Sequence, residues 1–508
     1  MESRAITQTP PAQSPPRAPS GGTVEGSRWR AWASSPLLVA SVICLALAAL
    51  SAAVLPTVPS YDPWSWIVWG REIINPHLGF STGGGPSWKP LPVIFTTPYG
   101  LFSGAAPTLW VITARAGGLL SLVAAYRLAG RLTRGAPWMA AVAGVIAALG
   151  VALTQEWSYY MFRGTSEPML VGLSLWAVDR HLDGRRSTAF VLGVAAALIR
   201  PEAWPFIGLY GIWLWRREPR LRPLVIAGWA SIPVLWFGPP WVASGQPFLA
   251  SAHAKEYNGH LGKNPFLEVL RRGADLQILP VLIIAAVGVA LAWFKDRDRL
   301  WLGLAAAVAA WWVLVVAMTL DGYPGLERFY LPGAGLTCVL AGASVVRIAQ
   351  AVGSWLSGRE GWAQRATAVS IGVVALLVIV SIPFSTSRIN EARAQEPIAA
   401  RAVTRLDHLT AAVAAVGGKR GVYPCKVSFA AVNHGVQTAL AWKLAVTLGR
   451  VGTSMRHSGV LFVGPRDTID GSPARIDPRL TQSKLIAQVD EWKVYQRTAP
   501  NHTACVGG

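Results

Sequence analysis

The residues best suited to chemistry lie in a short polar segment, Tyr61-Asp62-Pro63-Trp64-Ser65-Trp66, directly after an apolar run. That run, from Pro36 to Leu55, has no charged residue and is long enough to cross a hydrocarbon core, which takes about 20 residues. Asp62 therefore lies near a membrane surface, where a lipid-linked substrate presents its head group. A carboxylate in this place can accept a proton from an attacking hydroxyl group.

Asp62 also has a structural explanation. Asp is a preferred helix N-cap and Pro63 suits a first helical turn, so we expect a helix that begins here with Asp62 as its cap. Trp66, Trp69 and Ile73 share one face at helical spacing, typical of a helix that lies in the head-group layer. A capping carboxylate is oriented by backbone amides, so the cap and the base are compatible roles.

Two charged pairs occur at the ends of later apolar runs. Arg163 and Glu167 are four residues apart, which fits either a local ion pair or a functional site. Arg200-Pro201-Glu202 separates two apolar runs by a nearly minimal connection, so its charges lie close to membrane depth. Charges there face a cavity or one another, and the planar fork of an arginine suits phosphate oxygens. Functional and structural interpretations stay open for both pairs.

Further cationic residues stand at comparable positions. Arg328 and Tyr330 begin a late apolar run, where they either snorkel to the interface or grip a phosphate or diphosphate group. Lys89, between Trp88 and Pro90, offers a similar point charge. Arg115 lies inside the second apolar run, where a charge indicates an interhelical contact or a function.

Signatures of metal and nucleotide sites are missing from the sequence. His253, Lys255, Glu256 and His260 lie in one loop, but no pair has the pattern of metal ligands, so we expect no metal site. No GxxxxGK[ST], no convincing HExxH and no GxGxxG after a strand occurs. ATP-driven transport and metalloprotease chemistry therefore have no support.

The composition is that of an integral membrane protein. The chain has 508 residues, of which 52% are hydrophobic and 14% charged, whereas soluble domains average about 25% charged. The net charge of +20 does not indicate nucleic-acid binding, because many Lys and Arg residues lie in short loops between apolar runs. The composition of residues 1–35 predicts a disordered cytoplasmic tail. The run at 36–55 predicts a retained signal anchor rather than a cleaved signal peptide.

Eleven apolar runs predict eleven transmembrane helices. Alternate connections between them are strongly basic, so the positive-inside rule places those loops and the N-terminus in the cytoplasm of a multi-pass inner (plasma) membrane protein. Asp62 and the charged pairs then face outward. The predicted spans are 36–55, 107–126, 136–154, 167–179, 187–199, 203–215, 223–238, 277–294, 300–320, 329–346 and 367–384.

Residues 386–508 predict a small extracytoplasmic α+β domain. No run there is long enough to span; segments 459–463 and 492–495 alternate as strands do, and 397–416 favours a helix. Cys44 and Cys338, inside predicted spans, are expected to be packing residues. An oxidising compartment would permit a disulfide between Cys425 and Cys505, although spacing alone does not establish it.

These residues together resemble the GT-C superfamily of polytopic glycosyltransferases, which use polyprenyl-phosphate sugars. Asp62 matches the position of the family's catalytic base, an acid in the first extracytoplasmic loop. Arg163…Glu167-Pro168 and 197–202 are similar to the family's middle spans, whose outer ends line the donor pocket. Residues 328–332 look like the family's late Arg-Tyr-x-x-Pro segment. The resemblance covers residues 36–385, and a C-terminal domain at 386–508 fits many members.

The resemblance implies a glycosyltransferase that moves a sugar, such as mannose or arabinose, from a lipid-phosphate donor to a glycan, glycolipid or protein acceptor. Many members carry two adjacent acids, whereas Pro63 follows Asp62 here and the next acid is Glu72. This departure favours a single inverting base over a paired-acid or metal-assisted scheme. A transporter or flippase of a lipid-linked substrate, or a non-catalytic scaffold that binds cell-wall polymer, remains the alternative.

Overall fold

The computed structural model describes residues 35–256, 261–358, 365–425, 428–465 and 471–498. Each of the eleven apolar runs forms a helix in this structure. The tail at 1–34 lies outside the described residues, so the prediction that it is disordered stays a prediction. The eleven helices are α2 (Pro36–Val54), α5 (Ala106–Leu132), α6 (Pro137–Ala152), α8 (Glu167–Leu182), α9 (Arg186–Ala197), α10 (Trp204–Arg217), α11 (Arg222–Ser244), α14 (Leu279–Leu291), α15 (Arg299–Leu320), α16 (Leu331–Ser357) and α17 (Ala366–Ala415).

The number of membrane-crossing helices is smaller than the eleven predicted spans. Among the described residues, seven helices are long and apolar enough to cross, or eight if α6 and the bent continuation α7 (Trp157–Arg163) form one span. Helices α8, α9 and α10 have 16, 12 and 14 residues, which is short of the roughly 20 that a full crossing takes. The helical membrane-protein class is confirmed, and eleven full spans are not.

Helix α16 forms the centre of the bundle and contacts α5, α6, α8, α14, α15 and α17. Its small residues allow this close packing. A Cβ atom added at Gly342 would lie 2.3 Å from the carbonyl oxygen of Ala143 on α6, so only glycine fits. Helices of membrane proteins commonly approach one another across such small residues, because dispersion contacts rather than the hydrophobic effect hold them together in lipid.

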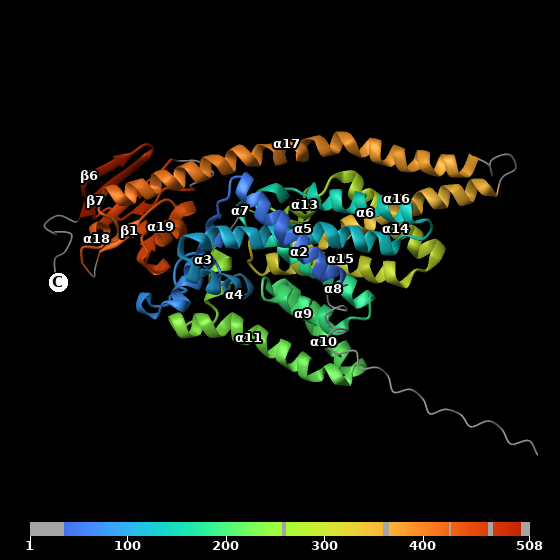
Figure 1. The fold of residues 1–508 in the computed structure, drawn as a ribbon, viewed down its shortest axis with the longest axis horizontal. Helices are drawn as coiled ribbons and strands as arrows, with labels where there is room; N and C mark the ends of the chain where they lie inside the picture. Colours follow the sequence, from blue (N-terminus) through green and yellow to red (C-terminus); the bar gives the residue numbers. More distant parts are fainter. Residues whose placement is uncertain (1–34, 257–260, 359–364, 426–427, 466–470, 499–508) are drawn as a thin grey trace, which may run out of the picture.

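Helix α17 runs along the outside of the bundle and reaches the C-terminal sheet (Figure 1). Its first half exposes large apolar side chains, including Ile371, Leu376 and Ile379, as expected of a surface that faces lipid. The helix continues through residue 386 without a break. The boundary between 36–385 and 386–508 remains our proposal, and one helix belongs to both parts.

Shorter elements connect the long helices. The N-terminal half has α3 (Tyr61–Ile74) and α4 (Pro90–Tyr99), and the middle has α12 (Leu249–Glu256) and α13 (Pro265–Asp275). Short helical turns mark several breaks: η1 (Pro76–Leu78), η2 (Gly100–Ala105), η3 (Pro201–Ala203), η4 (Pro219–Leu221), η5 (Ala292–Asp296) and η6 (Glu327–Tyr330).

Helix α3 is buried in the protein instead of lying in the head-group layer, which corrects the prediction from its tryptophans. Trp66 and Trp69 have no exposed surface. Trp66 packs edge-on against Trp110 of α5 at 5.2 Å, and Trp69 contacts Trp88 at the same distance between ring centroids. Two of the three residues of the predicted apolar face therefore pack against protein, whereas the third, Ile73, is exposed. Helical periodicity alone does not distinguish these two surroundings.

The C-terminal region forms the predicted small sheet at one end of the bundle (Figure 1). Strand β1 is parallel to β2 and β4, and β7 is antiparallel to β4 and β6, in the order β2-β1-β4-β7-β6. The predicted strands at 459–463 and 492–495 are confirmed, and the predicted helix at 397–416 is the end of α17. The strands are β1 (Phe429–Ala431), β2 (Val451–Gly452), β3 (Ser454–Met455), β4 (Gly459–Val463), β5 (Arg475–Ile476), β6 (Gln482–Val489) and β7 (Trp492–Thr498).

Helices of the C-terminal region join this sheet to the bundle. They are α18 (Gly418–Val422), η8 (His434–Val436), α19 (Gln437–Lys443) and η9 (Leu448–Arg450). The fully buried Trp492 donates its indole N–H to the carbonyl of Arg405 on α17, 3.1 Å away. Cys44 and Cys338 are buried free thiols, as expected for packing residues. Cys505 lies outside the described residues, so its pairing with Cys425 stays a prediction.

Candidate active site

Six of the charged residues singled out in the sequence come together at the ends of separate elements. We call them the charged cluster: Asp62, Lys89, Glu167, Arg200, Glu202 and Arg328. Asp62 lies in the first turn of α3, Lys89 just before α4, and Glu167 in the first turn of α8. Arg200 and Glu202 lie at the break between α9 and α10, and Arg328 in η6 before α16.

Asp62 is not the helix cap that its neighbour Pro63 predicted. The N-cap is Ser60, whose N–H donates to the carbonyl of Arg163 and whose carbonyl accepts from Trp64 N–H. Helix α3 thus begins one residue before Asp62, and no capping bond orients its carboxylate. Arg328 and Lys89 hold it instead, with Arg328 Nη1 at 3.4 Å and Lys89 Nζ at 4.0 Å from Oδ2.

Glu167 is the buried centre of the charged cluster. Its Oε1 lies 2.6 Å from Arg200 Nη2, 3.6 Å from Lys89 Nζ and 3.9 Å from Arg328 Nη1. Its side chain is only 1% exposed, whereas that of Asp62 is 20% exposed. Burying an ion is costly unless partners compensate, so Glu167 is suited to fixing three cations in place. The more accessible Asp62 is suited to contact a substrate.

Neighbouring side chains complete the surroundings of the cations. Lys89 Nζ lies 3.3 Å from Ser166 Oγ and 5.1 Å from the centre of the Trp66 ring. Arg200 lies over the ring of Phe329 at 4.5 Å, and Glu202 Oε1 is 3.3 Å from Arg200 Nη1. Ser166 and Phe329 were missed from the sequence. Their position next to Glu167 and Arg328 was the only available signal.

Two predicted site residues take different positions. The buried Tyr330 ring packs against Trp312 of α15 at 4.8 Å, and its hydroxyl has no hydrogen-bond partner among the described residues. Arg163 ends α7, and its carbonyl anchors Ser60 at the start of α3. Arg115 serves interhelical contact, since its guanidinium donates to Ser51 Oγ and to the carbonyls of Pro56 and Met161.

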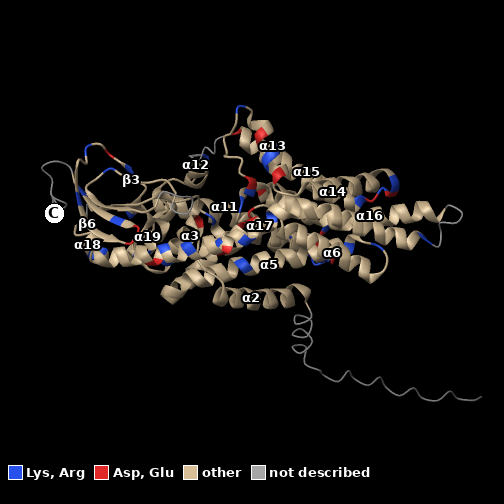
Figure 2. Ribbon diagram, turned by 90° about the horizontal axis from the view of Figure 1, so that it is seen from above, with Lys and Arg blue, Asp and Glu red and all other residues tan. Residues whose placement is uncertain are grey.

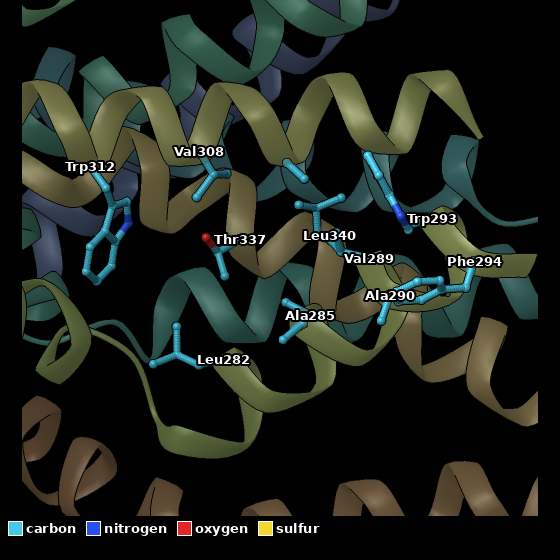
Figure 3. Close-up of a pocket in the computed structure, with 12 residues that line it drawn as sticks. Leu282, Ala285, Val289, Ala290, Trp293, Phe294, Val308, Trp312, Thr337 and Leu340 are labelled. Carbon is cyan, nitrogen blue, oxygen red and sulfur yellow. The ribbon is translucent and has the colours of Figure 1, made fainter. Parts of the chain in front are cut away.

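An apolar groove of about 580 Å³ lies between α14, α15 and α16 (Figure 3). Leu282, Val289 and Phe294 line it from the α14 side, and Leu340 lines it from α16. Trp312 also lines the groove and contacts Tyr330, two residues after Arg328. The groove is thus connected through two packed aromatic rings to the segment that carries a cation of the charged cluster.

Metal ligation finds no support in the described part of the chain. There, no group of three or more His, Cys, Asp or Glu side chains is placed to hold a metal ion. In the loop considered above, Lys255 instead pairs with Asp321 at 2.8 Å. His260, from the same loop, lies outside the described residues.

Comparisons with known proteins identify the fold. No protein-family model and no curated protein sequence matches the chain. Among solved structures, it is similar to ArnT from Cupriavidus metallidurans bound to undecaprenyl phosphate, with a TM-score of 0.55 and 14% identity, over 91% of this chain and 98% of that one. The apo state of ArnT gives a TM-score of 0.53 and 14% identity, over 93% and 98%. The chain therefore has the fold of these ArnT structures, in agreement with the polytopic glycosyltransferase fold expected from the resemblance.

Proposed function

We propose that the protein is a glycosyltransferase that moves a sugar from a polyprenyl-phosphate donor to an acceptor hydroxyl, with Asp62 as the general base. The observation that carries this proposal is the placement of Asp62 beside Arg328 and Lys89, 3.4 Å and 4.0 Å away. A base and phosphate-binding cations are thereby in one site. The fold is shared with an ArnT structure that contains undecaprenyl phosphate.

The reaction requires these groups in distinct roles. Asp62 accepts the proton of the acceptor hydroxyl, whose oxygen attacks the anomeric carbon of the donor sugar. The bond from that carbon to the phosphate oxygen breaks with inversion, and polyprenyl phosphate leaves with the bonding electrons. Lys89, Arg200 and Arg328 offset the negative charge that develops on it. General-base assistance supplies roughly 10²–10⁴-fold, so preorganised charge must supply much of the remaining acceleration.

The apolar groove in Figure 3 offers a place for the lipid chain of the donor. A polyprenyl chain is uncharged and flexible, so it needs an apolar channel that ends near the phosphate site. Trp312, which lines the groove, packs against Tyr330, two residues after Arg328, and this proximity supports the proposal. The chain would lie against α14 and α15 while its phosphate reaches the charged cluster.

The proposed membrane orientation places the charged cluster and the C-terminal domain outside the cytoplasm and the N-terminus inside. Figure 2 shows Lys and Arg residues where α14 connects to α15, at the end of the bundle away from the C-terminal sheet. That connection contains Lys295, Arg297 and Arg299, and basic short loops favour the cytoplasmic side. Mannose or arabinose is the proposed sugar, and a glycan, glycolipid or protein the acceptor.

Substitution of Asp62 by Asn tests the proposal. Membranes that contain Asp62→Asn should transfer no sugar from a radiolabelled polyprenyl-phosphate donor, while protein level and donor binding persist. Asp321→Asn is the matched control, because Asp321 is 71% exposed and pairs with Lys255 outside the charged cluster. Undiminished transfer by Asp62→Asn would refute the mechanism. Movement of intact donor across the membrane without sugar transfer would favour a flippase instead.

A further inference from the structure

The helix that carries Asp62 is joined to the C-terminal domain by hydrogen bonds at its first residue. Tyr61 donates its hydroxyl to Gln437 Oε1 at 2.9 Å, and Thr438 Oγ1 donates to the Tyr61 carbonyl at 2.9 Å. Gln437 is itself fixed, because its Nε2 donates to the Val451 carbonyl of β2. Helix α19 therefore sets the position of the residue directly before Asp62.

A second set of contacts joins the other end of α3 to the same domain. Arg71 donates to the carbonyls of Trp442 and Val446 at 3.0 Å and 2.8 Å. Glu72 accepts from Ser81 N–H at 3.0 Å and from Leu448 N–H at 3.3 Å. With both ends of α3 attached, the C-terminal domain has a fixed position relative to Asp62. A side chain of this domain can thus belong to the active site.

His434 is an aromatic side chain of this domain that lies next to the residue before Asp62. Its ring stacks on Tyr61, with 4.6 Å between ring centroids and 27° between the planes. The residue is nevertheless exposed, because Tyr61 covers only part of it. The backbone N–H of His434 donates to the Ser472 carbonyl at 2.9 Å, and the buried Asn433 before it accepts from Gly464 N–H. The imidazole is therefore held at a defined place.

The chemistry on this part of the site differs from that of the charged cluster. Partial desolvation lowers the pKa of His434, and the charge on Asp62 opposes this shift. The imidazole is therefore neutral at neutral pH, able to donate and accept hydrogen bonds. Lys89 and Arg328, by contrast, present positive charge to Asp62. Cations suit the donor phosphate, whereas a neutral aromatic pair suits an uncharged partner.

We infer that His434 and Tyr61 form the acceptor-binding site, and that the acceptor is a saccharide whose ring packs on the exposed imidazole of His434. This inference rests on the proposed glycosyltransferase function. A sugar ring has a face of polarised C–H bonds, which the negative face of an aromatic ring attracts. Its hydroxyl groups suit the imidazole nitrogens as hydrogen-bond partners. Because Tyr61, on which His434 stacks, directly precedes Asp62, a saccharide bound there would present a hydroxyl group to Asp62.

The experiment uses the full chain in lipid nanodiscs with a radiolabelled polyprenyl-phosphate sugar and a panel of octyl and methyl glycosides as acceptors. His434→Ala should raise the KM for the acceptor glycoside about tenfold, equivalent to about 1.4 kcal/mol, with kcat and donor KM nearly unchanged. His434→Phe, which keeps a ring, should restore much of the affinity. His457→Ala is the control, because His457 is also exposed but contacts Phe429 of β1.

The outcomes separate the inference from the function on which it rests. An unchanged acceptor KM in His434→Ala, or a shift in donor KM instead, would overturn the acceptor site. Donor consumption by the wild-type protein with no transfer to any glycoside would overturn the saccharide class and leave the glycosyltransferase standing. Equal use of methyl and octyl glycosides would indicate a free glycan, and use of octyl glycosides alone a glycolipid; either supports the inference.

A second measurement needs no turnover. Diethylpyrocarbonate modifies exposed histidines, and mass spectrometry reports each site separately. Each glycoside of the panel is tested at the same concentration, and at least one should protect His434 but not His457 from modification, in wild type and in Asp62→Asn alike. Protection in a wild-type protein that neither consumes the donor nor transfers sugar would support the binding site and refute the proposed function. Equal modification of His434 with and without glycoside would refute the binding site.

Discussion

Arg328 and Asp62 form an ion pair across 266 residues of sequence, with Arg328 Nη1 3.4 Å from Asp62 Oδ2. Arg328 also lies 3.9 Å from Glu167. The pair joins the first turn of α3 to the turn before α16, the central helix of the bundle. The proposed base and a proposed phosphate-binding group are therefore positioned by the same contact, and a change in either is expected to affect the other.

Replacement of Arg328 tests its role toward the leaving phosphate. Arg328→Ala should lower kcat by about 10²–10³-fold, as the loss of one preorganised charge-stabilising group does elsewhere. Arg328→Lys should lose less, because it keeps the charge but not the planar fork. Steady-state kinetics with a lipid-phosphate donor measures both variants. Arg271→Ala is the control, since Arg271 is 75% exposed on α13. A wild-type kcat in Arg328→Ala would show that Arg328 does not stabilise the leaving phosphate.

Glu167 is expected to matter for stability more than for proton transfer. Glu167→Gln leaves Arg200 and Lys89 without their closest buried counter-charge, which typically costs about 3–5 kcal/mol. Thermal unfolding of the detergent-solubilised protein should show a lower midpoint than wild type. Arg200→Gln in the same chain should restore part of the loss, because both members of the pair are then neutral. Additive losses in the double variant would show that the pair is not coupled.

The helices could be predicted from sequence because a long run of mostly apolar residues has few alternatives. All eleven runs form helices, but α9, with 12 residues, shows why run counting overestimates spans: a short apolar helix has the same composition as a part of a crossing one. The buried position of Trp66 could not be predicted, since lipid and protein select the same residues.

The members of the charged cluster could be predicted singly, because a charge at membrane depth is costly and therefore indicates a function or a buried partner. Which charges pair could not be predicted. Arg163 and Glu167 have helical spacing, yet Glu167 contacts Arg200, 33 residues away, because the turn at Gly164 separates α7 from α8. His434 carried no signal, since its stacking on Tyr61 depends on how two distant parts of the chain pack.

The apolar groove predicts a dependence on donor chain length. Ala290→Trp would fill part of the groove that Ala290 lines, so the KM for a long polyprenyl-phosphate sugar should rise several-fold. A short farnesyl-phosphate analogue should be affected less, because most of the groove stays empty when it binds. Ala309→Trp is the control, as Ala309 is exposed on α15 and does not line the groove. Equal effects on both donors would place the lipid chain elsewhere.

Glu72 predicts a pH dependence of the contact between α3 and the C-terminal domain. Burial raises the pKa of this carboxyl to about 7, against the opposing effect of the Ser81 and Leu448 amides. Between the pH that equals the ordinary pKa of a glutamate and pH 7, the Glu72 carboxyl is ionised in the unfolded protein but protonated in the folded protein. The free energy of unfolding therefore falls as the pH rises through this range. The loss is at most about 3 kcal/mol by linkage. Thermal unfolding midpoints should decline from pH 5 to pH 7 in wild type and much less in Glu72→Gln. Glu396→Gln is the control, because Glu396 lies at an exposed position of α17; its unfolding midpoint should decline as that of wild type does. The same decline in all three proteins would contradict the assignment to Glu72.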